Sequence, residues 1–511
     1  MGLEAALDRT RRRDLSFFFV LLFLVAPLWA TTPLSWTFIL YSLRSGAIWS
    51  YTWKGQLTFA FTICELFFSV YHQHLVNVVS KPWKHGTGDI AQLQIAFTRV
   101  LKAGLANLPE DGYDEESLDV DRPGSPLESI IQLEFSDPRS IDFRNVLRTW
   151  FARVPWSSIR RVEIQKWLYW SIFNKDLPEA HLIPPSHQAV LDDTLALLEK
   201  RLGTRVTDGS NPNILPMRMT LDKVQVSNRP FFFYALIFGI NWYLRLRYGR
   251  NWNLRHGNYD GLEYLLHVPE TWDPVDGPRP IVFLHGLGLG LLQYNYLIRD
   301  LYRQFPDRPL LIPLQPQVSQ NIFHPQFLNP ICRQDLADRL AGLMRDLGWV
   351  DFATKDSDDS GKGETSVSKT RGVTMLSHSN GSYLHAWCLK RYPEIIARSC
   401  FVDPVTFCSW EGDACYNFLY RPCSTGLELL VRYFVGTELG EIPNARNPSK
   451  TLFLLGGKDD IINSERVKKY LTSHGVRKGL WYDPNGRHGQ ALMSRGPGHT
   501  KVMRWLKAPD S

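Results

Sequence analysis

The second half of the chain alternates short apolar runs with segments of helical periodicity, beginning near Tyr264. The apolar runs predict strands at 281–284, 310–314, 373–376, 400–402, 452–455 and 480–482. The segments between and after them predict helices at 291–304, 331–347, 382–391, 464–473 and 500–506. Continuous apolar strands separated by helices are typical of a mostly parallel sheet that is covered on both faces. In such sheets, reactive groups gather at the carboxyl ends of the strands.

An uncharged apolar run near the N-terminus, residues 16–43, follows the arginines at 11–13. About 20 apolar residues are enough to cross a bilayer, so the run predicts a membrane anchor within residues 1–75. A secretory signal peptide would have a shorter apolar core and a small-residue cleavage site, and Ala26 and Ala30 leave cleavage as an alternative. Pro27 and Pro33 lie inside the run, so a kinked helix or a re-entrant hairpin is an alternative to one straight span.

A second apolar stretch, 56–71, contains Glu65. We slightly favour an amphipathic or buried helix over a second span, because a carboxylate at membrane depth is costly and normally points into protein. The anchor is therefore expected to have one or two spans. This choice decides the orientation of the chain. If the N-terminal arginines stay in the cytosol, one span sends the rest of the chain to the lumen and two return it to the cytosol.

The cysteines bear on the same question. The chain has 7 of them, an odd number without a CxxC pair, which argues against a disulfide framework and a structural zinc site. Asn380-Gly381-Ser382 is the only usable glycosylation sequon, because Asn447 is followed by proline. We therefore expect an intracellular membrane, such as that of the endoplasmic reticulum, with the catalytic part facing the reducing cytosol.

Residues 76–255 predict a helical region without a chemical motif. An acidic stretch rich in Pro, Gly and Ser, 108–138, predicts a surface loop. Apolar residues at helical spacing predict helices at 159–173 and 187–202. A third apolar stretch, 230–246, is flanked by arginines and predicts either a core helix, which we favour, or a helix that lies in a membrane interface.

Composition narrows the class of protein further. Of 511 residues, 44% are hydrophobic and 21% are charged, which excludes collagen-like, coiled-coil and disordered chains. The net charge of +7 is a mild excess for this length. Because no long basic run is interleaved with aromatic residues, nucleic acid is not expected as a partner.

The sequence SHSNG at 377–381 follows a predicted strand and precedes a predicted helix. A tight strand-to-helix turn strains the backbone of its central residue and lifts that side chain above the sheet. Small residues two positions to either side let such a turn close. Ser379 is therefore the candidate nucleophile. Ser377 stands where glycine is usual, and serine is small enough to be tolerated there.

The sequence HGLG at 285–288 follows the strand predicted at 281–284. Glycine flexibility lets a backbone N–H, that of Leu287 above all, turn toward the nucleophile. The N–H of Asn380 lies just after Ser379, at the start of the helix that follows the strand-to-helix turn, where the helix dipole is positive. This turn is called the elbow below. We expect these two N–H groups to form an oxyanion hole.

Two further loops follow predicted strands, with the sequences GGKDD at 456–460 and GRHG at 486–489. A carboxylate at Asp459 can orient the imidazole of His488 and stabilise its protonated form. His488 lies 29 residues after Asp459, which leaves room for one helix and one strand. The two side chains are therefore expected at neighbouring strand ends.

The order Ser, Asp, His, with each motif at a strand end, resembles the α/β-hydrolase superfamily of serine hydrolases over residues 256–511. The resemblance implies the α/β-hydrolase fold, a mostly parallel, doubly wound sheet with a helical cap insertion at about 404–450. The anchor and the helical middle are similar to those of membrane-anchored hydrolases whose substrates are largely unassigned. The site residues implied are Ser379 as nucleophile, His488 as base and then acid, Asp459 as orienting acid, and Leu287 and Asn380 as oxyanion donors.

Two acids compete with Asp459 for the orienting role. Asp460 is adjacent to it, and Asp403 ends the preceding predicted strand, a position that some members of the fold use for the acid. His499, which also lies near the C-terminus, competes with His488.

We therefore expect a membrane-anchored serine hydrolase that cleaves an ester of a lipophilic acyl substrate through an acyl-enzyme. The aromatic cap insertion is interpreted either as the wall of an acyl pocket or as the core of a small helical subdomain. An acyltransferase that uses the same first half-reaction and a catalytically silent membrane-bound scaffold are the alternatives. No metal ion or organic cofactor is expected.

Overall fold

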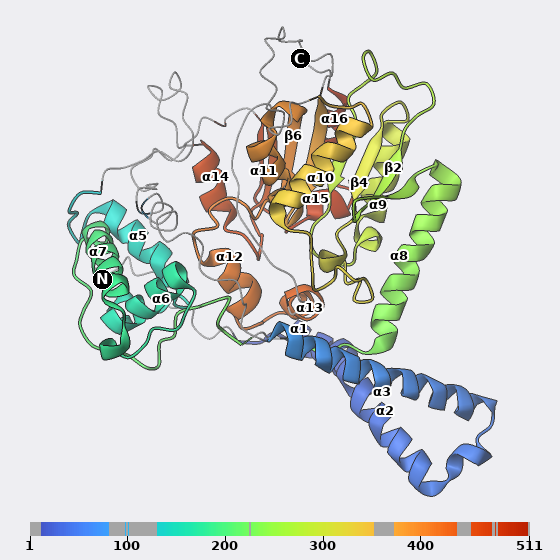
Figure 1. The fold of residues 1–511 in the computed structure, drawn as a ribbon, viewed down its shortest axis with the longest axis horizontal. Helices are drawn as coiled ribbons and strands as arrows, with labels where there is room; N and C mark the ends of the chain where they lie inside the picture. Colours follow the sequence, from blue (N-terminus) through green and yellow to red (C-terminus); the bar gives the residue numbers. More distant parts are fainter. Residues whose placement is uncertain are drawn as a thin grey trace.

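The computed structural model describes residues 12–80, 98, 101, 130–223, 226–351, 372–436, 451–472, 476 and 479–508. In this part of the chain an eight-stranded sheet forms the centre of the molecule, and helices cover both of its faces (Figure 1). A helical region lies to one side of the sheet, and an N-terminal helical hairpin projects away from the body (Figure 1).

The sheet has the order β1-β2-β4-β3-β5-β6-β7-β8. β1 pairs antiparallel with β2, β2 pairs antiparallel with β4, and the remaining pairs are parallel. This order and these directions define the α/β-hydrolase fold, which confirms the predicted fold class. The strands are β1 (Arg255–Tyr259), β2 (Leu262–His267), β3 (Ile281–Leu284), β4 (Leu310–Pro313), β5 (Val373–His378), β6 (Ile396–Val402), β7 (Thr451–Gly456) and β8 (Leu480–Asp483).

The strands predicted from apolar runs are β3 to β8. The largest differences are that β5 continues to His378 and that β6 begins at Ile396. The apolar pattern does not predict β1 or β2. β1 reads RHGNY, which contains no apolar run, and it exists because its backbone pairs with β2 along five residue pairs.

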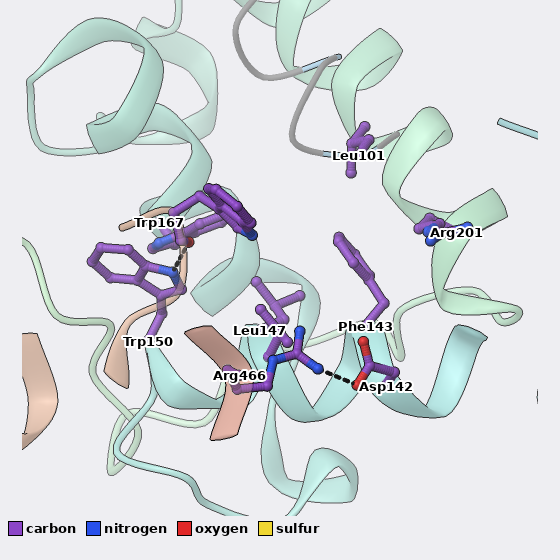
Figure 2. A pocket seen from close by; sticks show the side chains of 10 residues that line it. Leu101, Asp142, Phe143, Leu147, Trp150, Trp167, Arg201 and Arg466 are labelled. Atoms are coloured by element: carbon purple, nitrogen blue, oxygen red, sulfur yellow. Dashed lines mark hydrogen bonds and ion pairs between the residues drawn. The ribbon is translucent and has the colours of Figure 1, made fainter. Parts of the chain in front are cut away.

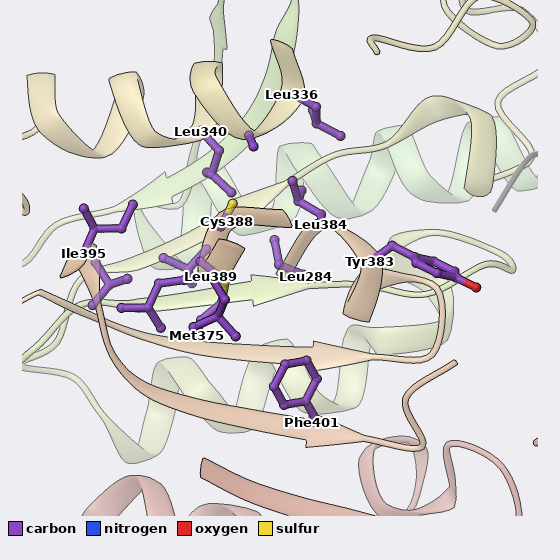
Figure 3. Close-up of a cluster of buried hydrophobic side chains, with 14 of the residues drawn as sticks. Leu284, Leu336, Leu340, Met375, Tyr383, Leu384, Cys388, Leu389, Ile395 and Phe401 are labelled. Carbon is purple, nitrogen blue, oxygen red and sulfur yellow. The ribbon is translucent and has the colours of Figure 1, made fainter. Parts of the chain in front are cut away.

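Helices cover the sheet with their apolar stripes. In α9 (Leu291–Gln304) the buried residues recur at intervals of three and four, as a helix with one buried face requires. α9 and α16 (Pro497–Lys507) contribute to the core on one face of the sheet, and α10, α11 and α14 contribute to the other. In Figure 3, Leu340 of α10 and Leu384 of α11 lie over Met375 of β5. The bounds are α10 (Arg333–Asp346), α11 (Gly381–Arg391) and α14 (Ser464–Thr472).

The insertion after β6 contains α12 (Asp413–Cys415) and α13 (Gly426–Val431), with π-helical turns at 416–420 and 432–436. Residues 437–450 of the predicted insertion lie outside the described residues. Its aromatic side chains join different clusters: Phe407 packs on the sheet core, Tyr416 on the helical region and Phe434 beside α8 (Phe231–Trp252). These three residues therefore belong to three separate cores rather than to one wall.

The helical region consists of α5 (Pro138–Thr149), α6 (Arg161–Phe173) and α7 (Pro185–Leu202), and the last two confirm the helices predicted there. α5 was not predicted, because the acidic composition before it favours a loop. Residues 108–129 of that predicted loop lie outside the described residues. The end of α5 contacts the insertion, where Trp150 Nε1 donates to Trp410 O at 3.1 Å and Gly412 N donates to Thr149 Oγ1 at 2.9 Å.

An arginine joins the helical region to the sheet domain. Arg466 of α14 binds the buried Glu411 of the insertion, with Nη2 at 2.7 Å and Nε at 3.1 Å from Oε1. Its Nη1 donates to Asp142 of α5 at 2.7 Å. Figure 2 shows this ion pair beneath Leu147 and Trp150. Three segments that are distant in sequence therefore share one guanidinium.

The N-terminal hairpin begins with α1 (Leu15–Val20), a π-helical turn at 21–25 and α2 (Ala26–Ser45). Together they form one helix, Leu15–Ser45, whose most apolar 18-residue window has a mean hydropathy of 2.1 and is 11% buried. It is the one described helix that is long and apolar enough to cross a membrane. The wide turn precedes Pro27, whose missing N–H and bulky ring disfavour regular α-helix one turn earlier.

The second helix of the hairpin, α3 (Trp53–Val79), is longer than the stretch recognised in the sequence and runs back beside α2. Trp36 Nε1 donates to Ser69 Oγ at 3.0 Å between the two helices. Glu65 is fully buried, and its oxygens accept the N–H groups of Phe231 and Phe232 at 2.7 and 3.0 Å. The carboxylate therefore caps the first turn of α8, where free N–H groups and a positive dipole end favour an anion.

Candidate active site

The candidate nucleophile lies on a tight turn between β5 and α11. Ser379 has φ of 48°, a left-handed conformation that costs energy for a residue with a side chain. Its N–H donates to Val402 O of β6 at 3.1 Å, which holds the turn against the sheet. A Cβ on Gly381 would lie 2.3 Å from Leu284 O, so the helix can pass this close to β3 only with glycine there. The predicted elbow is present in this geometry.

The structure brings the three residues of the predicted triad together. Ser379 Oγ lies 2.8 Å from His488 Nε2, and His488 Nδ1 lies 2.6 Å from Asp459 Oδ2. The other oxygen of Asp459 accepts backbone N–H groups from the two residues Ile461 and Ile462, at 2.8 and 3.0 Å. Because Asp459 can only accept, His488 Nδ1 carries a hydrogen and Nε2 faces the serine hydroxyl as an acceptor.

His488 is the group whose titration should control activity. Burial lowers the pKa of His488, but the charges of Asp459 and Asp403 outweigh burial and leave the pKa above its ordinary value. The imidazole must be neutral to accept the serine proton. We therefore expect kcat/KM to fall with decreasing pH at a midpoint above about 6.5. A profile measured with a soluble ester checks this, and an acid limb well below that value would contradict it.

Asp403, one of the rival acids, supports the site from behind. Its Oδ1 accepts Gly456 N–H at 2.9 Å and its Oδ2 accepts Gly489 N–H at 2.6 Å. In the described part of the chain no hydrogen bond joins it to His488. Burial, followed by the charge of Asp459, raises the pKa of Asp403 to about 7. Asp403 therefore ties the loop that carries Asp459 to the loop that carries His488.

The other rivals lie in different pairs. Asp460 is 3.9 Å from Arg421 and 3.8 Å from Arg487 at the surface. His499 Nε2 lies 3.1 Å from Asp300 Oδ2, on α9. Neither residue contacts Ser379 or His488 through a hydrogen bond among the described residues.

The loop at 285–290, here called the oxyanion loop, packs directly against the elbow. A Cβ on Gly286 would lie 3.0 Å from the Cβ of Ser379. Among the described residues, the N–H groups of Leu287 and Asn380 donate to no acceptor. Unused donors beside a nucleophile are what an oxyanion hole requires. The role of these two N–H groups as oxyanion donors stays a prediction.

Tyr294 and His378 brace the oxyanion loop, and motif spacing gave no sign of either role. Tyr294 OH accepts the N–H of Gly286 at 2.9 Å and is hydrogen-bonded to His378 Nδ1 at 2.6 Å. The His378 ring centre lies 5.2 Å from that of His488. Burial, together with the neighbouring imidazoles, lowers the pKa of His378. His378 therefore stays neutral and adds no positive charge beside the base.

Ser377, which replaces the usual glycine, has a role of its own. Its hydroxyl lies 2.8 Å from His385 Nδ1 of α11, and His385 Nε2 lies 3.0 Å from Ser399 Oγ of β6. All three side chains are buried. A polar chain beneath the elbow therefore links β5, α11 and β6.

Restoring the glycine is expected to harm the protein. Ser377→Gly leaves one nitrogen of buried His385 without a partner, so the free energy of unfolding should fall by about 1–3 kcal/mol. Urea unfolding followed by fluorescence measures the change. Ser377→Ala separates the hydrogen bond from the flexibility of glycine and should lose a similar amount. Unchanged stability in Ser377→Ala would show that the hydroxyl contributes nothing.

Asp403, Asp459 and His488 also offer ligand atoms within 4.8 Å of one another, close enough to hold a metal ion. Their donor atoms are already engaged, however. Both nitrogens of His488 and both oxygens of each carboxylate have the hydrogen-bond partners described above. The arrangement therefore fits a triad with a supporting carboxylate better than a metal centre.

Comparisons with known proteins give a likeness over about half of the chain. No family model matches the sequence, and no curated protein matches it. An α/β hydrolase enzyme from the sediment metagenome of the Mar Chica lagoon, Morocco, is similar over 50% of this chain and 98% of its own, at 16% identity and a TM-score of 0.30. A bacterial membrane phospholipase A is similar over 54% of this chain and 92% of its own, at 14% identity and a TM-score of 0.33. Carboxylesterase CesB from Bacillus subtilis is similar over 53% of this chain and 98% of its own, at 11% identity and a TM-score of 0.32. At these values, function has to be inferred from the site itself.

Proposed function

We propose that this chain is a membrane-anchored serine hydrolase that cleaves a carboxylic ester. The observation that carries the proposal is the continuous hydrogen-bonded series from Ser379 through His488 to Asp459, at 2.8 and 2.6 Å, on a strained elbow. A serine hydroxyl is a weak nucleophile until an adjacent base removes its proton, and this arrangement supplies that base.

The reaction proceeds in two halves. His488 Nε2 takes the proton of Ser379 Oγ as the oxygen attacks the ester carbonyl, and Asp459 stabilises the imidazolium. The N–H groups of Leu287 and Asn380 hold the oxyanion of the tetrahedral intermediate. His488 then protonates the leaving alcohol, which leaves an acyl-enzyme. Water, deprotonated by His488, releases the acid in the second half.

A lipophilic acyl group is supported by the apolar residues next to the oxyanion loop. Leu289 of that loop packs on a cluster that includes Phe233 of α8, Ile322 and Phe434 of the insertion. Ser379 itself is 9% exposed, so little of its surface meets solvent. An apolar surround that excludes water favours an acyl chain over a hydrated substrate.

A fluorophosphonate probe tests the chemistry. We expect wild type to be labelled and Ser379→Ala to remain unlabelled. Ser494→Ala, which removes an exposed serine hydroxyl near His488 in sequence, is the matched control and should label normally. Equal labelling of wild type and Ser379→Ala would overturn the mechanism. A series of esters with increasing acyl length then defines the substrate, and kcat/KM is expected to rise with chain length.

The hairpin supports placement of the catalytic body on the cytosolic face of an intracellular membrane. An antiparallel helix pair returns the chain to the side of the membrane from which it entered, whether the pair crosses the bilayer or only dips into it. Arg12 and Arg13 precede α1, and basic residues next to an apolar segment favour the cytosol. In sealed microsomes, we expect added protease to digest the C-terminus. Full protection of the C-terminus would place the body in the lumen.

A further inference from the structure

The outer face of α8 is apolar although it faces away from the protein. Its inner face packs on the body through Phe233, Tyr234 and Ile237 in one cluster and Leu244 and Tyr248 in another. Four large residues on the other side are each between 52% and 58% exposed, namely Leu236, Trp242, Tyr243 and Leu246. A contiguous apolar stripe of this kind on a soluble protein marks a binding surface.

The position of the stripe identifies what covers it. α8 begins against the hairpin, where Glu65 caps its first turn and the Phe61 and Phe232 ring centres lie 6.1 Å apart. Figure 1 shows the hairpin leaving the body beside this end of α8. The stripe therefore begins beside α3, which packs along the helix that is apolar enough to enter a bilayer.

The composition of the stripe fits a lipid interface. Trp and Tyr prefer the headgroup boundary of a membrane, where the ring is partly dry and the polar tip stays wet. Arg247 and Arg250, both exposed, lie at the end of the stripe and can reach lipid phosphates. A helix with one face in protein and the other apolar and aromatic is suited to lie in the plane of the interface.

The inner side of α8 holds the oxyanion loop. Asn241 Nδ2 donates to Leu289 O at 3.0 Å, and Asn241 Oδ1 accepts the N–H of Leu292 at 3.1 Å. Leu289 lies two residues after Leu287, one of the proposed oxyanion donors. A single side chain of α8 therefore fixes both ends of the turn that leads from the oxyanion loop into α9.

We propose that the outer face of α8 lies in the headgroup region of the bilayer that holds the hairpin, and that Asn241 transmits this docking to the oxyanion loop. The second part rests on the proposed function, since an oxyanion loop matters only if Ser379 reacts. Docking would hold α8 in one position, and Asn241 would then hold the Leu287 N–H where the oxyanion forms. A donor displaced by a fraction of an ångström loses much of its effect.

A nitroxide label tests docking without any reaction. The cysteines that are not buried are first replaced by serine, and the full chain is reconstituted in phospholipid vesicles. The label is attached to the cysteine introduced by Tyr243→Cys. The control carries the label at Lys390→Cys, an exposed position of α11. We expect the label at 243 to collide with oxygen dissolved in the bilayer more than with a water-soluble nickel chelate. The label at 390 should show the reverse. The same water-dominated collisions at both sites would overturn docking. The replaced cysteines are Cys64, Cys332, Cys415 and Cys423.

Activity tests the second part in the same vesicles. Trp242→Glu with Leu246→Glu and, separately, Asn241→Ala should each lower kcat/KM for a soluble ester about tenfold or more. Thr500→Glu with Arg504→Glu, exposed at the same spacing on α16, is the control for added charge. Asn241→Ala should leave the nitroxide signal at 243 unchanged, whereas a general loss of structure would change that signal. Full activity in Asn241→Ala would overturn the coupling. Absence of fluorophosphonate labelling in wild type would instead overturn the proposed chemistry and leave the docking result standing.

Discussion

Replacing Asp459 by asparagine is expected to lower kcat/KM about 10⁴-fold while leaving the fold intact. Asp459 Oδ1 accepts two backbone N–H groups, so an amide at this position keeps its oxygen there and turns its NH₂ toward His488. His488 Nδ1 must then accept, and its hydrogen moves to Nε2. The base that faces Ser379 becomes a donor and cannot take the serine proton. Hydrolysis of a soluble ester, normalised to folded protein, measures the loss.

Two other aspartates serve as controls for this prediction. Asp460→Asn changes the neighbouring carboxylate, whose side chain is 46% exposed, and should leave turnover close to wild type. Asp403→Asn loses one of two buried acceptors and should cost about 1–3 kcal/mol of stability, with a smaller loss of activity. Since Asp403 helps to raise the pKa of His488, this variant should also move the acid limb of the pH profile downward. Abolished turnover in Asp403→Asn with an active Asp459→Asn would reverse the assignment.

Replacing Arg466 by methionine is expected to lower the free energy of unfolding by about 3–5 kcal/mol, because it leaves Glu411 buried without a counter-charge. Glu411 is 3% exposed, and burial raises its pKa to about 7 even beside Arg466. A carboxyl with a raised pKa binds its proton more tightly in the folded than in the unfolded state. The penalty should therefore shrink in mildly acidic buffer. Urea unfolding of the full chain in detergent at two pH values measures both effects.

Arg391→Met provides the matched control. This arginine also pairs with an aspartate, Asp338, but the two side chains are 47% and 36% exposed. The control should cost no more than about 1 kcal/mol. The double variant Arg466→Met with Glu411→Met should recover much of the loss, since it removes the uncompensated charge. Equal losses in Arg466→Met and Arg391→Met would show that the shared guanidinium does not hold the helical region to the sheet domain.

The sheet shows how far apolar patterning reaches. β3 to β7 are buried strands and β8 is partly buried, and each contains an apolar run that is visible in the sequence. β1 lies at the edge and reads RHGNY, and its stability comes from backbone pairing with β2, which leaves no trace in the sequence. Edge strands of this kind require the neighbouring strand to be known first.

The site also contains residues that the sequence predicts and residues that it does not. Ser379, His488 and Asp459 were predictable because each follows a strand in a loop rich in small residues. The supports were not, because Tyr294, Asn241 and Asp403 act through contacts between elements far apart in the chain. Ser377 looked like a tolerated departure from glycine, and only the position of His385 gives its hydroxyl a partner.

α8 resisted prediction for a different reason. Its sequence is apolar on all sides, so helical periodicity could not say which face is buried. From the sequence, a core helix and an interfacial helix were therefore treated as exclusive alternatives for this segment. One face of α8 is buried in the core and the other is exposed and apolar, so the core description that we favoured holds for the inner face only.

The elbow also restricts how the protein can be made. Asn380, whose N–H is a proposed oxyanion donor, begins the sequon that ends at Ser382, and the Ser382 hydroxyl donates to Ser379 O at 2.6 Å. A glycan on Asn380 would place a bulky hydrated group directly beside Ser379, the proposed nucleophile. A body that entered the lumen during synthesis would offer this asparagine to the glycosylation machinery before the elbow had folded. The proposed oxyanion role of Asn380 is therefore compatible with synthesis on the cytosolic side, where this sequon meets no glycosylation machinery.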